Sequence, residues 1–359
     1  MGFVNPEGSG SLGVLMMGEA GGGHERVQGL PFRPNAPAGS VLERAIKLAG
    51  FSRSQFRLAN TVNCSPPRDW LVGAPWEFGA IAHCELHRSR IIQEMKPKVI
   101  LALGGTAFRT LTGFSGKGQG IEIMRGYPIE TEQGLVLGTL HPSHLVRGQM
   151  RLMGLLVHDI QRAVRLARTG FQKREIQYCM FPSVEEALQF EEEVRANPDL
   201  PLAYDIETPM TKGGQGDEEL YEEEEPDVTP ITSIQFSLHP GTGIYFPWIE
   251  PFIGIATRIL GLPNPKIGHN CLRFDNRRLK EHGVRVKGTI HDTMEAFRHL
   301  QRDLRNYYNL QAVASFYGGD RPWKHLSESE PEFYGITDVD MDQRIWAKLP
   351  EDMKKRGIW

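Results

Sequence analysis

The first half of the chain alternates short apolar runs with amphipathic stretches, and this alternation restricts the folds that it can adopt. Apolar runs of strand length occur in SLGVLMMGEA, FRLANTVNC, KVILALGG and GLVLGTLHPS. Strands that alternate with helices build a parallel sheet that is covered by helices. We therefore predict a parallel-sheet α/β/α domain of three layers. Its chemistry should lie on the loops at the carboxyl ends of the strands.

Three longer helices are predicted between or after these strands. Residues 40–50 have apolar side chains at helical spacing, with Ser40 as the N-cap and a glycine at the C-terminal end. Residues 76–95 are predicted as one helix, and residues 154–170 as the helix that closes the domain.

A second α/β unit is predicted to begin near residue 171, in the segment RTGFQKR, so the domains are 1–170 and 171–359. Residues 175–181 and 200–208 have the composition of strands, and the helix between them starts with Ser183 and a glutamate three residues later. ITSIQFSL and GTGIYFPW predict two antiparallel strands of a hairpin, so this unit should have a mixed sheet.

Charge is unevenly distributed along the 359 residues, whose formal net charge is -3. Residues 1–170 hold 19 Lys and Arg against 12 Asp and Glu, whereas the remainder holds 22 against 32. A basic half favours a polyanionic partner. Eight acids between Asp217 and Asp227 predict a solvated loop that repels nucleic acid. With no membrane-length apolar stretch and no signal pattern, we expect a soluble cytoplasmic protein that binds no membrane.

The sequence YDIETP places two acids one residue apart, directly after an apolar run. Residues i and i+2 of a strand share a face, so the carboxylates of Asp205 and Glu207 should point to the same side. Two like charges this close are unfavourable unless one is protonated or a cation lies between them. A divalent metal with oxygen ligands fits best, while an exposed loop without a metal is the alternative.

Further acids follow in a recognisable order. Asp275 lies in GHNCLRFDNRRLKEHG, and Tyr334 and Asp338 lie four residues apart in EFYGITDVDMDQRIW, on one face of a predicted helix. Together with HDTMEAF, these motifs resemble the DEDD superfamily of 3′–5′ exonucleases. The match spans about residues 172–350 and is close to the proofreading domains of family A DNA polymerases, which have a ribonuclease H-like fold.

This resemblance implies a set of site residues and cofactors. Two divalent ions, Mg²⁺ or Mn²⁺, would be held by four carboxylates, and Tyr334 would orient the attacking water. Asn270 would support Asp275 or contact the substrate. The implied metal ligands are Asp205, Glu207, Asp275 and Asp338.

Motifs of the first half carry a second resemblance. GEAGG, GLPF, NTVNCSPP, PKVILALGGTAF and HPSHLVR, with Cys84, resemble the uracil-DNA glycosylase superfamily, in the group that includes the iron–sulfur family 4 enzymes. The match covers about residues 12–168. It implies that Phe32 stacks on a flipped uracil, that Asn60 hydrogen-bonds the polar edge of the base, and that His141 donates to the oxygen on which negative charge develops.

The same resemblance implies supporting roles for three more side chains. Glu19 would lie in the loop beneath the base, Glu25 would polarise water, and Arg147 would support the backbone or the pocket. Cys64 and Cys84 match two cluster ligands, but a cluster normally takes four, so no iron–sulfur cluster is predicted.

The two resemblances together predict a DNA replication or repair protein. In the first hypothesis, a metal-dependent exonuclease acts on single-stranded 3′ ends, and the glycosylase-like domain binds DNA, including uracil-containing DNA, without catalysis. In the second, both domains are catalytic. In the third, the chain is a DEDD ribonuclease that trims RNA. A polymerase domain or a replisome partner is also expected, in a bacterial or phage-infected cell.

Overall fold

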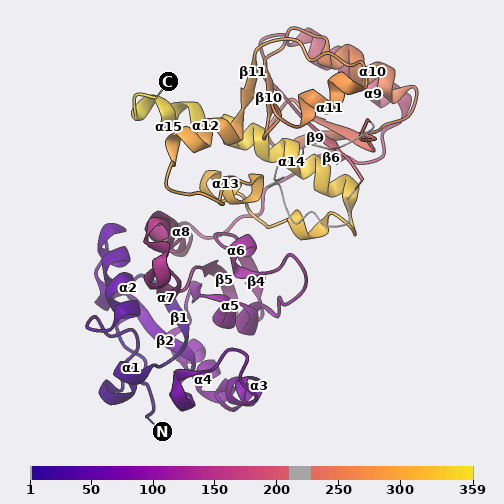
Figure 1. The fold of residues 1–359 in the computed structure, drawn as a ribbon. Helices are drawn as coiled ribbons and strands as arrows, with labels where there is room; N and C mark the ends of the chain where they lie inside the picture. Colours follow the sequence, from indigo (N-terminus) through magenta and orange to yellow (C-terminus); the bar gives the residue numbers. More distant parts are fainter. Residues whose placement is uncertain (1, 210–227, 359) are drawn as a thin grey trace. The chain divides into compact units, whose positions relative to one another are not determined.

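The computed structural model describes residues 2–209 and 228–358, and it contains two compact units (Figure 1). Unit 1 comprises Met1–Lys173 with Asp320–Pro322, and unit 2 comprises Arg174–Gly319 with Trp323–Trp359. The acidic segment 217–227 lies outside the described residues.

Unit 1 is built on a five-stranded sheet with the order β2-β1-β3-β5-β4. Four strands are parallel, and β4 pairs antiparallel with β5 at one edge. Strand β3 is a wholly buried apolar run and β1 is buried over its first five residues, as expected for a parallel sheet covered on both faces. They are β1 (Val14–Ala20), β2 (Arg57–Val62), β3 (Val99–Leu103), β4 (Pro128–Thr131) and β5 (Gly134–Thr139).

Helices cover both faces of this sheet. Side chains from alternate positions of β1, such as Leu15 and Met17, pack against α4 and α5, while α8 packs on β3 and β5 and also contacts α2. The predicted three-layer α/β architecture is thus confirmed. The helices are α1 (Gly23–Gln28), α2 (Pro37–Leu48), α3 (Glu77–His83), α4 (Glu85–Met95), α5 (Gly105–Thr112), α6 (Ile121–Met124), α7 (Pro142–His144) and α8 (Met153–Thr169).

Three local predictions for unit 1 were wrong. The N-cap of α2 is Ala36 rather than Ser40, because Pro37 can occupy the first turn, where no amide donor is needed. The helix predicted over 76–95 is divided at Cys84 into α3 and α4. The hairpin strand β4 was missed, since its four residues show little apolar alternation.

Unit 2 has a six-stranded mixed sheet with the order β11-β10-β7-β8-β9-β6. The hairpin of β8 and β9 is antiparallel and β7 pairs antiparallel with β8, whereas β10 runs parallel to both β7 and β11. The predicted mixed sheet is confirmed. The strands are β6 (Gln177–Cys179), β7 (Leu202–Glu207), β8 (Ser233–Ser237), β9 (Thr242–Pro247), β10 (Lys266–Gly268) and β11 (Ile290–Asp292).

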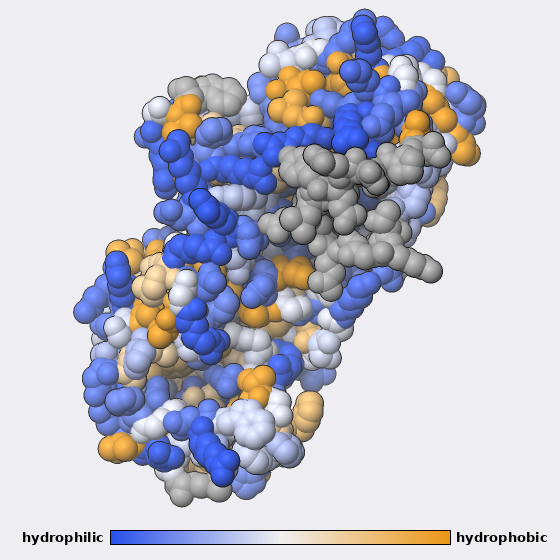
Figure 2. Space-filling model, in the orientation of Figure 1, coloured by the Kyte–Doolittle hydropathy of each residue, from blue (hydrophilic) through white to orange (hydrophobic). Residues whose placement is uncertain are grey.

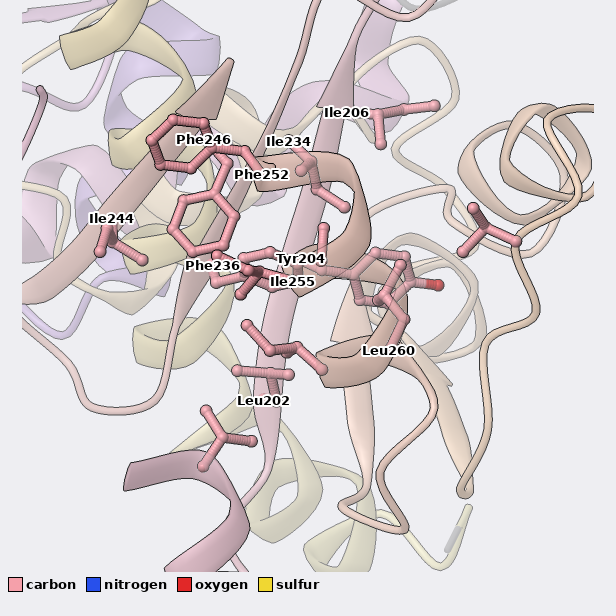
Figure 3. Close-up of a cluster of buried hydrophobic side chains, with 14 of the residues drawn as sticks. Leu202, Tyr204, Ile206, Ile234, Phe236, Ile244, Phe246, Phe252, Ile255 and Leu260 are labelled. Atoms are coloured by element: carbon pink, nitrogen blue, oxygen red, sulfur yellow. The ribbon is translucent and has the colours of Figure 1, made fainter. Parts of the chain in front are cut away.

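The two faces of this sheet have different coverings. One face packs with α9 and α10 around a buried cluster that includes Leu202, Tyr204 and Phe236 (Figure 3). The other face carries α14, which contacts four of the strands. Ser183 caps α9 and forms the predicted capping box with Glu186. The helices are α9 (Val184–Ala196), α10 (Phe252–Leu260), α11 (Asp275–Glu281), α12 (Thr293–Leu300), α13 (Leu310–Tyr317), α14 (Pro331–Trp346) and α15 (Leu349–Lys355).

Hydropathy varies along the helices and over the surface that is drawn. Among the described residues, every helix is too short or too polar to cross a bilayer. On the face drawn in Figure 2, hydrophobic residues form small groups separated by hydrophilic ones.

Candidate functional site

In unit 1, the predicted site residues gather at the carboxyl ends of the parallel strands. Glu19 is near the end of β1, Asn60 lies in the last half of β2, and His141 follows β5 by two residues. Because β1 pairs with β2 and with β3, which pairs with β5, these strand ends share one edge of the sheet. This is the edge at which α/β sheets commonly bind ligands.

Gly18 of β1 leaves room for the side chains of Phe32 and Asn60. A Cβ on Gly18 would lie 2.3 Å from the Phe32 ring and 2.7 Å from the Asn60 side-chain oxygen. Both side chains are buried, at 4% and 2% exposure, and the Phe32 ring centroid is 5.9 Å from that of His141. Phe32 also has a φ of 47°, which is rare for a non-glycine residue. The structure thus brings together the three residues that the resemblance assigned to the base.

His141 is held as a neutral donor. Its Nδ1 accepts the backbone N–H of Ser143 at 3.1 Å, so a neutral ring carries its proton on Nε2. Burial, with a smaller contribution from the nearby Arg147 charge, lowers the pKa of His141 to about 4. Gly104 permits this placement, because a Cβ there would lie 2.8 Å from the His141 Cβ.

A pocket of about 510 Å³ opens beside His141 and is also lined by Glu19, Trp70, Arg109 and Arg147. The Thr106 hydroxyl donates to Glu19 at 2.9 Å, and burial raises the pKa of the Glu19 carboxyl. Phe32 and Asn60 are buried and are not among the residues that line this pocket.

Three residues from the sequence motifs of unit 1 are not among those that line this pocket: Glu25, Cys64 and Cys84. Glu25 accepts the backbone N–H of Gly22 at 3.0 Å and so closes the first turn of α1. Cys64 is partly exposed and Cys84 is buried, and both are free thiols. Burial and the neighbouring Cys84 thiol raise the pKa of Cys64, so the two matched cysteines are close to each other.

In unit 2, strand periodicity separates the core residues of β7 from its acids. Leu202, Tyr204 and Ile206 point into the cluster beneath α9 and α10. Asp205 and Glu207 therefore point to the opposite face, which α14 covers.

Helix α14 completes an acidic cluster on that face. One oxygen from each of Asp205, Glu207 and Asp338 lies within 4.8 Å of the others. The close approach of helix and sheet depends on Gly335, where a Cβ would lie 2.6 Å from the Gln235 side chain of β8. Within the described part of the chain, this is the one group of three His, Cys, Asp or Glu side chains so arranged.

Asp275 lies next to this cluster, at the start of α11. It is 2% exposed, and its Oδ1 accepts the N–H of Ile206, the residue between the two acids of β7, at 3.0 Å. Burial and the charges of Asp292 and Asp338 raise the pKa of Asp275 to about 7, against the opposing effect of the Ile206 hydrogen bond. Burial and the carboxylates of Asp275, Glu207 and Asp338 raise the pKa of Asp205 well above its usual range.

Asp292 organises the turn that precedes Asp275. It caps α12 and also accepts the backbone N–H groups of Asn270 and Leu272, at 3.0 and 3.2 Å. Asn270 has a φ of 61°, so this turn includes a left-handed residue. The ring of His269 contacts the Thr293 hydroxyl and the Tyr308 carbonyl rather than Asp275.

Lys324 and Trp323 also belong to the site, although the sequence did not indicate them. The Lys324 Nζ donates to Asp338 Oδ2 and to the Tyr334 hydroxyl, both at 2.8 Å. The Trp323 indole N–H donates to the other oxygen of Asp338. No periodicity or spacing in RPWKHL marks either residue, because the loop reaches the site only through the tertiary fold.

The acidic cluster suits a divalent metal. Its ligand atoms are carboxylate oxygens, which Mg²⁺ and Mn²⁺ prefer. The raised pKa values of Asp205 and Asp275 reflect negative charge that the protein compensates only in part, and a bound cation would compensate it.

Solved structures similar to this chain include nucleases. The catalytic core of RRP6 from Trypanosoma brucei is 14% identical, with a TM-score of 0.39, and 51% of this chain and 48% of that chain are covered. Escherichia coli RNase D, an exoribonuclease, is 18% identical, with a TM-score of 0.35, over 51% of this chain and 46% of that chain. These scores are too low to establish an activity.

Unit 1 has relatives in sequence. The type-4 uracil-DNA glycosylase of Saccharolobus solfataricus is 32% identical over 102 residues, and that of Pyrobaculum aerophilum is 31% identical over 114 residues. These alignments cover 28% and 32% of this chain, and about half of each relative's length, 44% and 55%. The family model of the uracil DNA glycosylase superfamily matches residues 6–161. Residues 6–161 are therefore similar to the uracil DNA glycosylase superfamily, and a second α/β unit follows them in the same chain.

Proposed function

We propose that unit 2 is a divalent-metal-dependent 3′–5′ exonuclease. The observation that carries this proposal is the cluster of Asp205, Glu207 and Asp338, whose oxygens converge within 4.8 Å at the end of a buried strand. Strand β7 and helix α14 are both packed into the core, so the cluster is rigid before any ion binds.

Four carboxylates would hold the ions. Asp205, Glu207 and Asp338 converge directly, and Asp275 joins them through the Ile206 amide that its Oδ1 accepts. Divalent ions bound there would generate a nucleophile from water and neutralise charge on the attacked phosphodiester. Tyr334 lies one helical turn before Asp338, and its hydroxyl would orient the attacking water.

We further propose that the substrate is single-stranded DNA with a free 3′ end, and that the exonuclease proofreads. The similarity of residues 6–161 to the uracil DNA glycosylase superfamily favours DNA. RNA is the alternative, since the similar structures include an exoribonuclease. The expected link to a family A polymerase stays a prediction from the sequence.

The test is shortening of a 5′-labelled single-stranded DNA in Mn²⁺, beside an RNA of the same sequence. We expect Asp205→Asn to lower the rate by about 10³-fold, because the change removes the negative charge of a metal ligand. Asp199→Asn, at an exposed acid of the same unit, should leave the rate unchanged. Undiminished digestion by Asp205→Asn would reject the proposal, and faster digestion of RNA would assign the substrate to RNA.

A second candidate function is excision of uracil by unit 1. The neutral His141 ring, with its proton on Nε2, favours it, because a neutral donor of this kind can stabilise negative charge that develops on a departing base. Glu19, Asn60, Phe32 and Arg147 would complete the base-binding site. A domain that binds uracil-containing DNA without cutting the glycosidic bond is the alternative.

This second function can be measured without interference from the nuclease. Uracil-containing single-stranded DNA is incubated with the full chain in EDTA and then treated with alkali to break abasic sites. We expect breaks at uracil that fall about 10²-fold or more in His141→Ala and persist in His83→Ala, at an exposed histidine. Binding without breaks would identify a binding domain.

A further inference from the structure

Lys324 places a cation inside the acidic cluster of unit 2. Its Nζ lies 2.8 Å from Asp338 Oδ2, and the two side chains are 20% and 4% exposed. The same ammonium lies 2.8 Å from the Tyr334 hydroxyl and 4.6 Å from the centre of its ring. It thus contacts both the proposed metal ligand and the proposed water-orienting residue.

The protein holds Lys324 in this position through buried contacts. The Gln311 side chain of α13 is 1% exposed, and its Oε1 accepts the backbone N–H groups of Trp323 and Lys324, at 2.9 and 2.8 Å. Trp323 is fully buried and donates its indole N–H to Asp338 Oδ1. Adjacent residues of one pinned segment therefore bind both oxygens of Asp338.

In this arrangement, a lysine and a divalent metal would bind the same carboxylate. Asp338 Oδ2 accepts the ammonium, and an Asp338 oxygen is also one of the three atoms that converge on the candidate metal position. A divalent ion bound there would share the carboxylate with a positive charge and be repelled by it. Lysine can yield, because its charge lies at the end of a flexible four-carbon stem.

We propose that Lys324 is the internal counter-ion of the nuclease site and that it competes with the divalent ion for Asp338. The inference rests on the proposed metal-dependent function. Before metal binding, Lys324 neutralises part of the acidic cluster. Metal binding then requires its ammonium to leave Asp338, so Lys324 sets the ion concentration at which the site fills.

The experiment measures metal binding rather than catalysis. Mn²⁺ is titrated into the full chain by calorimetry at constant pH. Lys324→Gln removes the charge but keeps a hydrogen-bond donor, and Lys324→Met is a second neutral variant. We expect both to bind Mn²⁺ about tenfold more tightly than the natural chain, as the loss of one competing charge predicts. Lys280→Met, at an exposed lysine of α11, should bind as the natural chain does.

A second measurement covers the stability of the variants. Without metal, Lys324→Gln should have a lower Tm than the natural chain, because the carboxylates lose their counter-ion, and Mn²⁺ should raise its Tm by more. Equal or weaker Mn²⁺ binding by folded Lys324→Gln would overturn the inference while leaving the metal site intact. Failure of the folded natural chain to bind Mn²⁺ would instead reject the proposed function and this inference with it.

Discussion

The two candidate sites use the same part of an α/β sheet but treat charge in opposite ways. Both lie at strand ends, on β1, β2 and β5 in unit 1 and on β7 in unit 2. In unit 1, burial keeps His141 uncharged and Glu19 has a raised pKa, so the site favours neutral groups. In unit 2, several carboxylates are concentrated around one lysine.

This difference indicates what each site still needs. The donors of unit 1 are set by the protein alone, through the Ser143 amide, the Thr106 hydroxyl and the space left by Gly104. The carboxylates of unit 2 are buried beside one another, and burial, followed by their mutual repulsion, raises the pKa values of Asp205 and Asp275. The side chains of unit 1 are therefore positioned without an ion, whereas the acidic cluster of unit 2 carries charge that a cation would compensate.

Removal of divalent ions should produce the largest difference between the activities of the two sites. We expect EDTA to abolish shortening of DNA 3′ ends and to leave recognition of uracil-containing DNA unchanged, because the converging carboxylates belong to unit 2. Restoring Mn²⁺ should restore the shortening. The comparison fails if EDTA leaves the nuclease active, or if it removes uracil recognition from a protein that is still folded.

A single methyl group should damage the site of unit 1 without affecting that of unit 2. In Gly18→Ala the new Cβ would meet the Phe32 ring at 2.3 Å and Asn60 at 2.7 Å, so both side chains must move. We expect uracil recognition to fall about 10²-fold, as for misplacement of a site residue by about 1 Å, with Mn²⁺-dependent shortening retained. Gly79→Ala is the matched control, since nothing lies within 4 Å of its Cβ. Unchanged uracil recognition in Gly18→Ala would show that recognition does not depend on the positions of Phe32 and Asn60.

Local patterns predicted the elements of both units better than their details. The alternation of apolar runs and helices indicated the α/β class, and the Ser183 start indicated the α9 cap. Short-range signals failed where tertiary contacts decide. Four residues of β4 form a strand only because β5 pairs with them, and the predicted helix over 76–95 breaks at the buried Cys84.

The same limit applies to the sites. Strand and helix periodicity predicted that Asp205 and Glu207 share a face and that Tyr334 and Asp338 lie one turn apart. Thr106 hydrogen-bonds Glu19, which is 87 positions away, and Lys324 hydrogen-bonds Asp338, which is 14 positions away. Gly104 leaves room for His141, which is 37 positions away. No local pattern marks these residues, so sequence periodicity could not identify them.

The two sites should also respond to pH in opposite directions. The folded-state pKa of Asp275 is raised to about 7, so unfolding releases its proton and the free energy of unfolding falls as pH rises from about 4 to 7. The pKa of His141 is lowered to about 4, so its contribution to that free energy rises between about 4 and 6.5.

Replacing Asp275 tests this contrast. Without metal, Asp275→Asn should be more stable than the natural chain at pH 8 by on the order of 2–4 kcal/mol, and by much less at pH 4. Asparagine can still accept the Ile206 amide, so the hydrogen bond is kept. Urea unfolding at both pH values measures the difference, and saturating Mn²⁺ should reverse it. Asp303→Asn, at an exposed acid, should show no pH-dependent difference.

The smallest expected effect concerns the hydroxyl beside His141. Ser143→Ala removes an oxygen 2.7 Å from Nδ1 but keeps the backbone N–H that Nδ1 accepts at 3.1 Å. Because the backbone N–H still selects the tautomer, uracil recognition should weaken by only about 0.5–1 kcal/mol.

Burial remains the main cause of the low pKa of His141, so NMR titration of the ring should still find it uncharged at pH 6. Ser40→Ala, on the exposed face of α2, is the control. A His141 that titrates near 6.5 in Ser143→Ala would show that the hydroxyl, rather than burial, keeps this site neutral, and the contrast with the charged site of unit 2 would then depend on one side chain.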